Sequence, residues 1–197
     1  FRGEYRGYER LAQGYGLNVV RHPRAEYRRS LTEATLQKGD RLYITQPSSL
    51  DGNLWKRFPQ FLGWLEDREV GLEVMLDLGY VGTVGRDYLI SARSSVVHTV
   101  FLSLSKPLGM PGHRVGALLS RQSRPGLEGP PWGTNLFSMK LGTVLMDEYG
   151  VRQLPHRYKS AQQQVIEGVN QESPLTFRAS DSLLLATAPL INGDSPA

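Results

Sequence analysis

The chain has 197 residues, of which 40% are hydrophobic and 21% charged, and its formal net charge is +4. A chain of this length and composition can bury a core, so we expect one main globular domain, with an incomplete second domain, and no general disorder. No apolar run approaches the roughly 20 residues that cross a bilayer, and no basic-then-apolar leader opens the sequence, which predicts a soluble, cytoplasmic protein. The absence of cysteine excludes disulfides, thiolate metal sites and cysteine nucleophiles. The sequence opens on Phe1 within an aromatic stretch, which suggests a trimmed chain.

Positive charge is concentrated at the start of the chain. The first 30 residues contain seven arginines and three glutamates, and four tyrosines are interleaved with them. Two interpretations are open. Cations and rings in this pattern can bind nucleic acid, because cations meet phosphates and rings stack on bases. Arginines on a solvated face are the commoner arrangement, so we expect no nucleic-acid partner.

Short apolar runs bounded by polar or glycine-containing stretches are typical of strands that are buried on both faces. Five such runs occur, at residues 17–20, 42–45, 72–76, 100–104 and 115–119. Helical patterns lie between several of them, at 54–69 and at 30–37, where Ser30 and Glu33 form a candidate capping box. The alternation of strands and helices predicts an α/β domain with a mostly parallel sheet flanked by helices.

The pattern changes after Arg121, where prolines and glycines indicate a loop. A helix is expected over 135–149, because four of its apolar side chains recur at helical spacing and form one stripe. A second helix is expected over 156–169 and a strand over 182–188, before a polar tail. No internal repeat or low-complexity block is present.

The loop after the run at 100–104 combines several groups that suit a phosphorylated cofactor. Ser103 and Ser105 can donate to phosphate oxygens, and the guanidinium of Arg114 can fork onto them. Lys106, partly desolvated between these groups, would have a lowered pKa and act as an amine nucleophile. A single lysine in a glycine-containing loop is more often a solvated charge, so this motif alone does not decide the function.

A carboxylate follows the apolar run at 72–76. Asp77 ends this run, and Tyr80 stands three residues further on. A carboxylate at the end of a buried strand needs a cation or hydrogen-bond donors. A protonated pyridine nitrogen would be such a partner and would make the ring a better electron sink. Capping of the following turn is an equally open alternative.

Taken in order, Asp-Leu-Gly-Tyr at 77–80, Ser-Leu-Ser-Lys at 103–106 and Arg-Val-Gly at 114–116 resemble the active-site motifs of fold-type I pyridoxal-phosphate (PLP) aminotransferases. In that family an aspartate with a tyrosine three residues on precedes Ser-x-Ser-Lys, and an arginine lies eight residues after the lysine. The resemblance implies PLP as the cofactor. It also implies a role for each residue: Asp77 would hold the pyridine nitrogen, Tyr80 the phenolic oxygen, Lys106 the Schiff base, and Ser103, Ser105 and Arg114 the phosphate.

Two further positions follow from the same resemblance. The stretch Glu-Tyr-Arg-Gly-Tyr-Glu at 4–9 is similar to the family segment whose aromatic residue stacks on the cofactor ring, which would be Tyr5; an ordinary half-buried tyrosine is the alternative. The family loop Asn-Pro-x-Asn-Pro-x-Gly is replaced by Gln-Pro-Ser-Ser-Leu-Asp-Gly at 46–52. Ser49 therefore takes the place of the asparagine that hydrogen-bonds the phenolic oxygen, and its shorter side chain can require a water to reach it.

The resemblance covers residues 1–149 and fits the remainder loosely. It divides the chain into a cofactor-binding large domain over 1–150 and a linker helix with the start of a smaller C-terminal α+β domain over 151–197. The family's glycine-rich phosphate-binding helix start would lie before Phe1. The family's substrate-carboxylate arginine usually lies in the small domain, of which only a part is expected here.

The implied activity is transfer of an amino group from an amino acid-like donor to a keto acceptor by a homodimer, with Lys106 as the proton carrier. Two alternatives are open. Elimination, decarboxylation or cyclisation would start from the same cofactor linkage. A degenerate, non-catalytic homologue could retain the fold as a binding module, and Ser49 favours that reading.

Other motifs predict no site. The four histidines, at 22, 98, 113 and 156, lack carboxylate or cysteine partners at ligand spacing, so no metal site is expected. Glycines at 79, 82 and 85 follow a strand but do not form a dinucleotide-binding fingerprint, and we interpret them as a loop.

Overall fold

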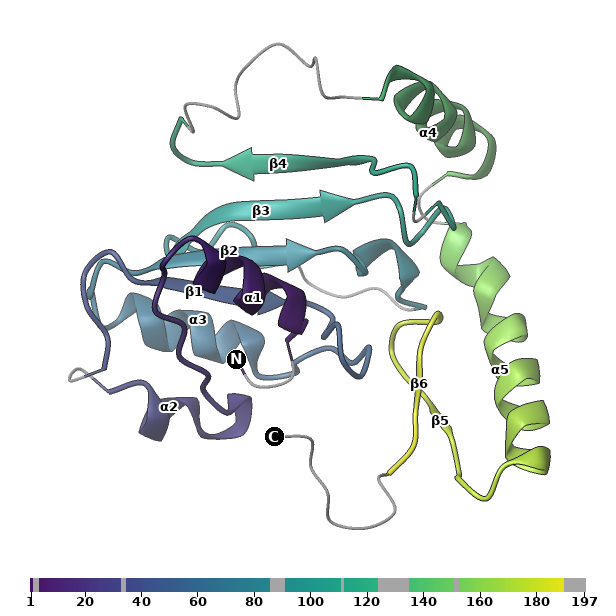
Figure 1. Ribbon diagram of the computed structural model, residues 1–197, viewed down its shortest axis with the longest axis horizontal. Coiled ribbons are helices and arrows are strands. Elements are labelled where there is room, and N and C mark those ends of the chain that lie inside the picture. Colours follow the sequence, from purple (N-terminus) through teal and green to yellow (C-terminus); the bar gives the residue numbers. More distant parts are fainter. Residues whose placement is uncertain are drawn as a thin grey trace.

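The computed structural model describes residues 1, 4–32, 35–85, 91–110, 112–123, 135–150 and 153–189. Its centre is a four-stranded sheet in the order β1-β2-β3-β4 (Figure 1). The strands are β1 (Arg41–Thr45), β2 (Glu73–Leu78), β3 (Val97–Ser103) and β4 (Gly116–Ser120). The bounds of β1, β2 and β4 lie within two residues of the runs expected at 42–45, 72–76 and 115–119, and β3 begins three residues before the run expected at 100–104.

The first three strands are parallel, and β4 is antiparallel to β3. In Figure 1 the arrows of β2 and β3 therefore point to the same side, and the arrow of β4 points to the other. In register, Asp77 stands opposite Thr45 on one neighbour and opposite Phe101 on the other. The prediction of a mostly parallel α/β sheet is confirmed. The carboxyl ends of β1, β2 and β3 meet at one edge of the sheet.

Helix α3 (Phe58–Glu66) makes the crossover between β1 and β2 and carries the core. A proline in its first turn suits the helix start, where the missing N–H has no intrahelical partner. Its buried side chains, Phe58, Phe61, Leu62 and Leu65, pack against one face of the sheet. The ring of Phe61 lies 4.8 Å from Trp55 and 5.0 Å from Tyr27, centroid to centroid, so the same core holds the short elements η1 (Arg24–Glu26) and α2 (Tyr27–Ser30).

Helix α1 (Arg6–Gly14) is attached to the opposite face. Side chains alternate along a strand, so Tyr43 points away from the core that contains Ile44. The ring of Tyr8 in α1 lies 4.6 Å from the ring of Tyr43. The sheet is therefore flanked by helices, as the sequence predicted (Figure 1).

The C-terminal part consists of two helices and a small hairpin. Helix α4 (Leu136–Tyr149) is capped by Asn135, whose side chain accepts from the Ser138 amide at 3.1 Å. Helix α5 (Leu154–Glu172) precedes the antiparallel pair β5 (Arg178–Ala179) and β6 (Ala186–Thr187). The hairpin joins the first part of the chain near η2 (Val81–Thr83), where the hydroxyls of Thr83 and Ser182 are 2.7 Å apart. The division at residue 150 stays a prediction.

Four expectations about local structure were wrong. Residues 17–20 form no strand. In place of the helix expected over 30–37, the chain forms α2, which already ends at Ser30. Glu33 of the expected capping box lies outside the described residues. Within 54–69 only α3 is helical. Within 182–188 only β6 is a strand, with a single bridge from Ser182 to Val84.

The face of α4 that packs against the rest of the protein is also not the apolar stripe expected from the sequence. Phe137 is 68% exposed, whereas Ser138 and Gly142 are buried. Small residues allow close approach: Ser138 contacts His113, and a Cβ on Gly142 would lie 3.4 Å from Val115. Within the described ranges, no helix is long and apolar enough to span a membrane.

Candidate active site

A buried carboxylate lies at the carboxyl end of β2. Asp77 accepts a hydrogen bond from the Gly79 amide on Oδ1 at 2.7 Å. Its other oxygen, Oδ2, accepts from the hydroxyl of Tyr8 at 3.2 Å and from the hydroxyl of Tyr43. These donors offset the cost of burying the charge. Asp77 therefore caps the turn after β2 and also presents a carboxylate in the interior of the site.

Both tyrosines keep their protons and so remain donors. Burial, followed by the negative charge of Asp77, raises the pKa of Tyr43 well above its usual value. Burial also raises the pKa of Tyr8. Neither residue was among the candidates from sequence. The signal that could have found Tyr43 is alternation, because it lies two residues before Thr45, the register partner of Asp77.

The lysine lies in the loop after β3. The Nζ atom of Lys106 is 5.4 Å from the centroid of the Tyr80 ring, which joins two of the expected site residues. The loop is held closed by the Met110 amide, which donates to the Ser105 carbonyl at 2.7 Å. Lys106 lies between the buried Ser105 and Pro107 but is itself exposed, so it does not show the expected desolvation.

The expected phosphate-binding residues occupy the same loop. Ser103 Oγ accepts from the Ser105 amide at 3.2 Å. Ser105 is buried, and its own hydroxyl has no partner among the described residues. Arg114 is exposed and stands just before β4 with φ at 44°, a left-handed conformation that costs energy in a residue other than glycine. Burial raises the pKa of Tyr8, and the positive charge of Arg114 acts against this rise.

Tyr5 and Ser49 are placed differently. Tyr5 is 64% exposed, so the alternative of a half-buried tyrosine is wrong. Its ring lies 5.5 Å, centroid to centroid, from the ring of Tyr8, whose hydroxyl donates a hydrogen bond to Asp77. Ser49 lies in the loop after β1, and its buried hydroxyl has no partner in the described part of the chain. Direct contacts thus form three sets: Tyr5 with Tyr8 and Asp77, Tyr80 with Lys106, and Ser103 with Ser105.

These residues fit a phosphorylated pyridine. Two buried hydroxyls, on Ser49 and Ser105, are left with an unused hydrogen bond, which a polar ligand would supply. A carboxylate suits a protonated ring nitrogen, and a guanidinium suits a phosphate. Across the described residues, no group of three histidine, cysteine or acidic side chains could hold a metal ion.

Comparison with known proteins identifies the fold. No protein-family model and no curated protein sequence matches the chain. Solved structures do match. Histidinol-phosphate aminotransferase from Clostridium acetobutylicum has a TM-score of 0.70 at 18% identity, over 91% of this chain and 57% of that one. L-threonine-O-3-phosphate decarboxylase from Porphyromonas gingivalis has a TM-score of 0.69 at 20% identity, over 92% and 56%. The chain has the fold of these enzymes.

A third structure with the aminotransferase fold contains the cofactor. Histidinol-phosphate aminotransferase from Sinorhizobium meliloti, solved in complex with pyridoxal-5'-phosphate, has a TM-score of 0.68 at 18% identity, over 91% of this chain and 51% of that one. The chain spans little more than half the length of each of these proteins. At such identities the match establishes the aminotransferase fold, the large-domain architecture expected from the fold-type I resemblance.

Proposed function

We propose that this chain carries the PLP-binding part of an enzyme that transfers an amino group from an amino acid-like donor to a keto acceptor. The observation that carries the proposal is the placement of a buried carboxylate, Asp77, and a lysine, Lys106, at the carboxyl ends of two neighbouring parallel strands. Open α/β sheets bind their ligands at the carboxyl ends of such strands. The aminotransferase fold and the two unpartnered serine hydroxyls support the same conclusion.

Each residue has a defined part in this proposal. Asp77 offers its remaining acceptor site to the ring nitrogen, and Tyr5 covers the ring. Tyr80 and Ser49 donate to the phenolic oxygen. The phosphate is held by Ser103, Ser105 and Arg114, of which Arg114 supplies the charge.

Lys106 is the residue that carries out chemistry. Its Nζ would hold PLP as a Schiff base. Nζ would also act as the proton carrier of the reaction and take the proton from the substrate carbon. Bound PLP supplies the electron sink that makes this carbon acidic. The tie between the Ser105 carbonyl and the Met110 amide keeps the start of the loop in place during these steps.

The first experiment tests cofactor attachment. The chain is mixed with PLP and reduced with borohydride, and the mass of the intact protein is measured by mass spectrometry. We expect visible absorbance before reduction and a mass increase of one reduced cofactor, both lost in Lys106→Ala. Lys140→Ala, a change of the same kind on the exposed side of α4, should retain both. Equal labelling of the two variants would contradict the assignment of Lys106.

The second experiment tests the reaction. A panel of amino donors is incubated with keto acids, and new amino acids are measured by chromatography. We expect exchange that requires both PLP and Lys106. A protein that binds PLP at Lys106 and exchanges no amino group across the panel would retain the cofactor assignment and lose the transferase assignment.

Other PLP reactions form the second candidate. It is favoured by the decarboxylase match and by a PLP-bound C-S lyase from Staphylococcus hominis, with a TM-score of 0.63 at 14% identity over 95% of this chain and 52% of that one. Release of carbon dioxide or of a thiol in the same panel would identify it.

That the protein is a homodimer and is cytoplasmic stays a prediction, which analytical sedimentation and cell fractionation test. A colourless protein that ignores PLP would indicate a binding module.

A further inference from the structure

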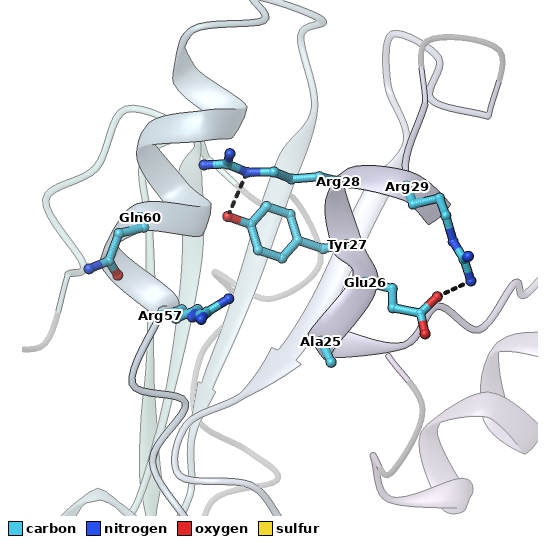
Figure 2. Close-up of a pocket in the computed structure, with 7 residues that line it drawn as sticks. All are labelled: Ala25, Glu26, Tyr27, Arg28, Arg29, Arg57 and Gln60. Carbon is cyan, nitrogen blue, oxygen red and sulfur yellow. Dashed lines mark hydrogen bonds and ion pairs between the residues drawn. The ribbon is translucent and has the colours of Figure 1, made fainter.

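A pocket of about 510 Å³ lies outside the candidate active site. It is formed by η1 and α2 on one side and by the start of α3 on the other (Figure 2). Three arginines line it, Arg28, Arg29 and Arg57, together with one acid, Glu26. Its volume is within the roughly 300–1,000 Å³ of small-molecule sites. None of the residues assigned to the cofactor contributes to it.

The pocket carries excess positive charge. Arg29 forms an ion pair with Glu26, and Figure 2 shows its side chain turned away from the other two arginines. The other glutamates of the first 30 residues are also occupied, because Glu4 pairs with Arg24 and Glu9 with Arg21. Within the described ranges no carboxylate pairs with Arg28 or Arg57.

Of the two guanidinium groups without a carboxylate partner, that of Arg28 is held against the core. Arg28 Nε donates to the hydroxyl of Tyr27 at 3.3 Å, and its guanidinium carbon lies 5.8 Å from the centroid of that ring. Tyr27 is itself buried among the rings of the core. Arg57 directly precedes α3, whose first residue, Phe58, is buried. Figure 2 shows Arg28 and Arg57 on two sides of Tyr27. The guanidinium of Arg28, anchored by Tyr27, loses less side-chain entropy when it binds a ligand.

We infer that this pocket binds a small phosphate monoester, separately from the proposed cofactor. A phosphate monoester is close to a dianion at neutral pH and matches two cations. Guanidinium groups bind its oxygens in pairs, through charge-assisted hydrogen bonds. The volume leaves room for an organic group beside the phosphate, which Gln60 could contact at the rim. This inference does not require the proposed enzymatic activity.

Calorimetric titration of the full chain with glycerol 3-phosphate tests the inference. We expect saturable binding that weakens at least about tenfold in Arg28→Gln/Arg57→Gln, since bonds to charged groups are the stronger class. Arg114→Gln separates this pocket from the proposed cofactor loop and should bind as the native sequence does. Arg10→Gln, on the exposed surface of α1, controls for the loss of general positive charge. Circular dichroism and thermal unfolding check that each variant is folded.

Four outcomes would overturn the inference. Binding lost in Arg114→Gln and retained in the double variant would place the ligand in the cofactor loop. Equal weakening in Arg10→Gln would mean non-specific attraction. Inorganic phosphate that binds as tightly as the monoester would mean that the organic group is not recognised. A single-stranded oligonucleotide that binds more tightly, and is displaced by salt, would identify a nucleic-acid surface in place of a small-molecule site.

Discussion

The hydroxyl of Tyr43 donates a hydrogen bond to Oδ2 of Asp77 across the pair β1 and β2. With Tyr8 on the same oxygen and the Gly79 amide on Oδ1, the carboxylate has three donors within the protein. A carboxylate offers about four acceptor sites, so one is left for a ligand. If Asp77 meets the ring nitrogen of PLP, as we propose, it does so through this remaining acceptor site.

Replacing Tyr43 with phenylalanine removes one of these donors. We expect the free energy of unfolding to fall by about 1–3 kcal/mol, because a buried charge loses a partner. With PLP labelled at the ring nitrogen, the ¹⁵N resonance should also shift, since Oδ2 of Asp77 gains a free acceptor site for the ring nitrogen. Tyr15→Phe, at an exposed position, should change the unfolding free energy by less than about 0.5 kcal/mol. An unchanged resonance in Tyr43→Phe would separate Tyr43 from the cofactor.

The raised pKa of Tyr43 makes the free energy of unfolding decrease as the pH rises in the alkaline range. The unfolded chain loses this phenolic proton near the usual pKa of 10.0, whereas the folded protein retains it. The unfolded state therefore binds fewer protons above about pH 10, so the contribution is complete below that pH and decreases as pH rises. Each such phenol contributes a slope of about 1.4 kcal/mol per pH unit. Urea unfolding across this range should give a shallower slope in Tyr43→Phe, and identical slopes would refute the assignment.

Gly82 touches the lysine loop, so a methyl group there should disturb it. A Cβ on Gly82 would lie 2.7 Å from Cγ and 2.9 Å from Cβ of Pro107, the residue after Lys106. We expect Gly82→Ala to lower stability by about 1–3 kcal/mol and to weaken PLP binding. Gly63→Ala, with nothing within 4 Å of the new Cβ in α3, should instead raise stability by about 0.5–1 kcal/mol. Denaturant unfolding and PLP titration of both variants test the contrast.

Thr83 joins the turn after β2 to the C-terminal hairpin. Its hydroxyl donates to the Tyr80 carbonyl at 2.8 Å and lies 2.7 Å from the hydroxyl of Ser182. Thr83→Val keeps the volume but leaves Ser182 buried without this partner, which should cost about 1–3 kcal/mol. Thr83→Ser retains the hydroxyl. If valine and serine prove equally destabilising, the loss comes from packing and not from the hydrogen bond. A double variant with Ser182→Ala measures the coupling.

Strands β1 and β2, which helices cover on both faces, were predictable; β4 was also predicted, although it is exposed and not buried on both faces as its apolar run indicated. The runs at 42–45 and 72–76 became β1 and β2 because they pair with neighbours and pack under α3. The run at 17–20 has a similar composition but stays unpaired. The outer edge of β1 is occupied by side chains instead: the Thr45 amide donates to Glu4, and the Thr45 carbonyl accepts from Arg24. Composition does not reveal that kind of competition.

The candidate site was predictable in part. Asp77, Tyr80 and Lys106 follow strands and carry spaced motifs, so their positions could be inferred, although their roles stay a proposal. Tyr8 and Tyr43 were missed, because a tyrosine in an amphipathic helix or an alternating strand is usually a packing residue. Their contact with Asp77 depends on the register of two strands and on how α1 lies on the sheet. Neither is encoded in local spacing.

The sheet ends at β4, where Leu118 and Leu119 are 40% and 55% exposed. In the part of the chain that the structure describes, no strand pairs with the outer side of β4. Exposed backbone donors beside apolar side chains form a template onto which other extended polypeptides can add. The 197-residue chain on its own should therefore aggregate as it is concentrated, which light scattering would detect, and Leu119→Lys should prevent this aggregation.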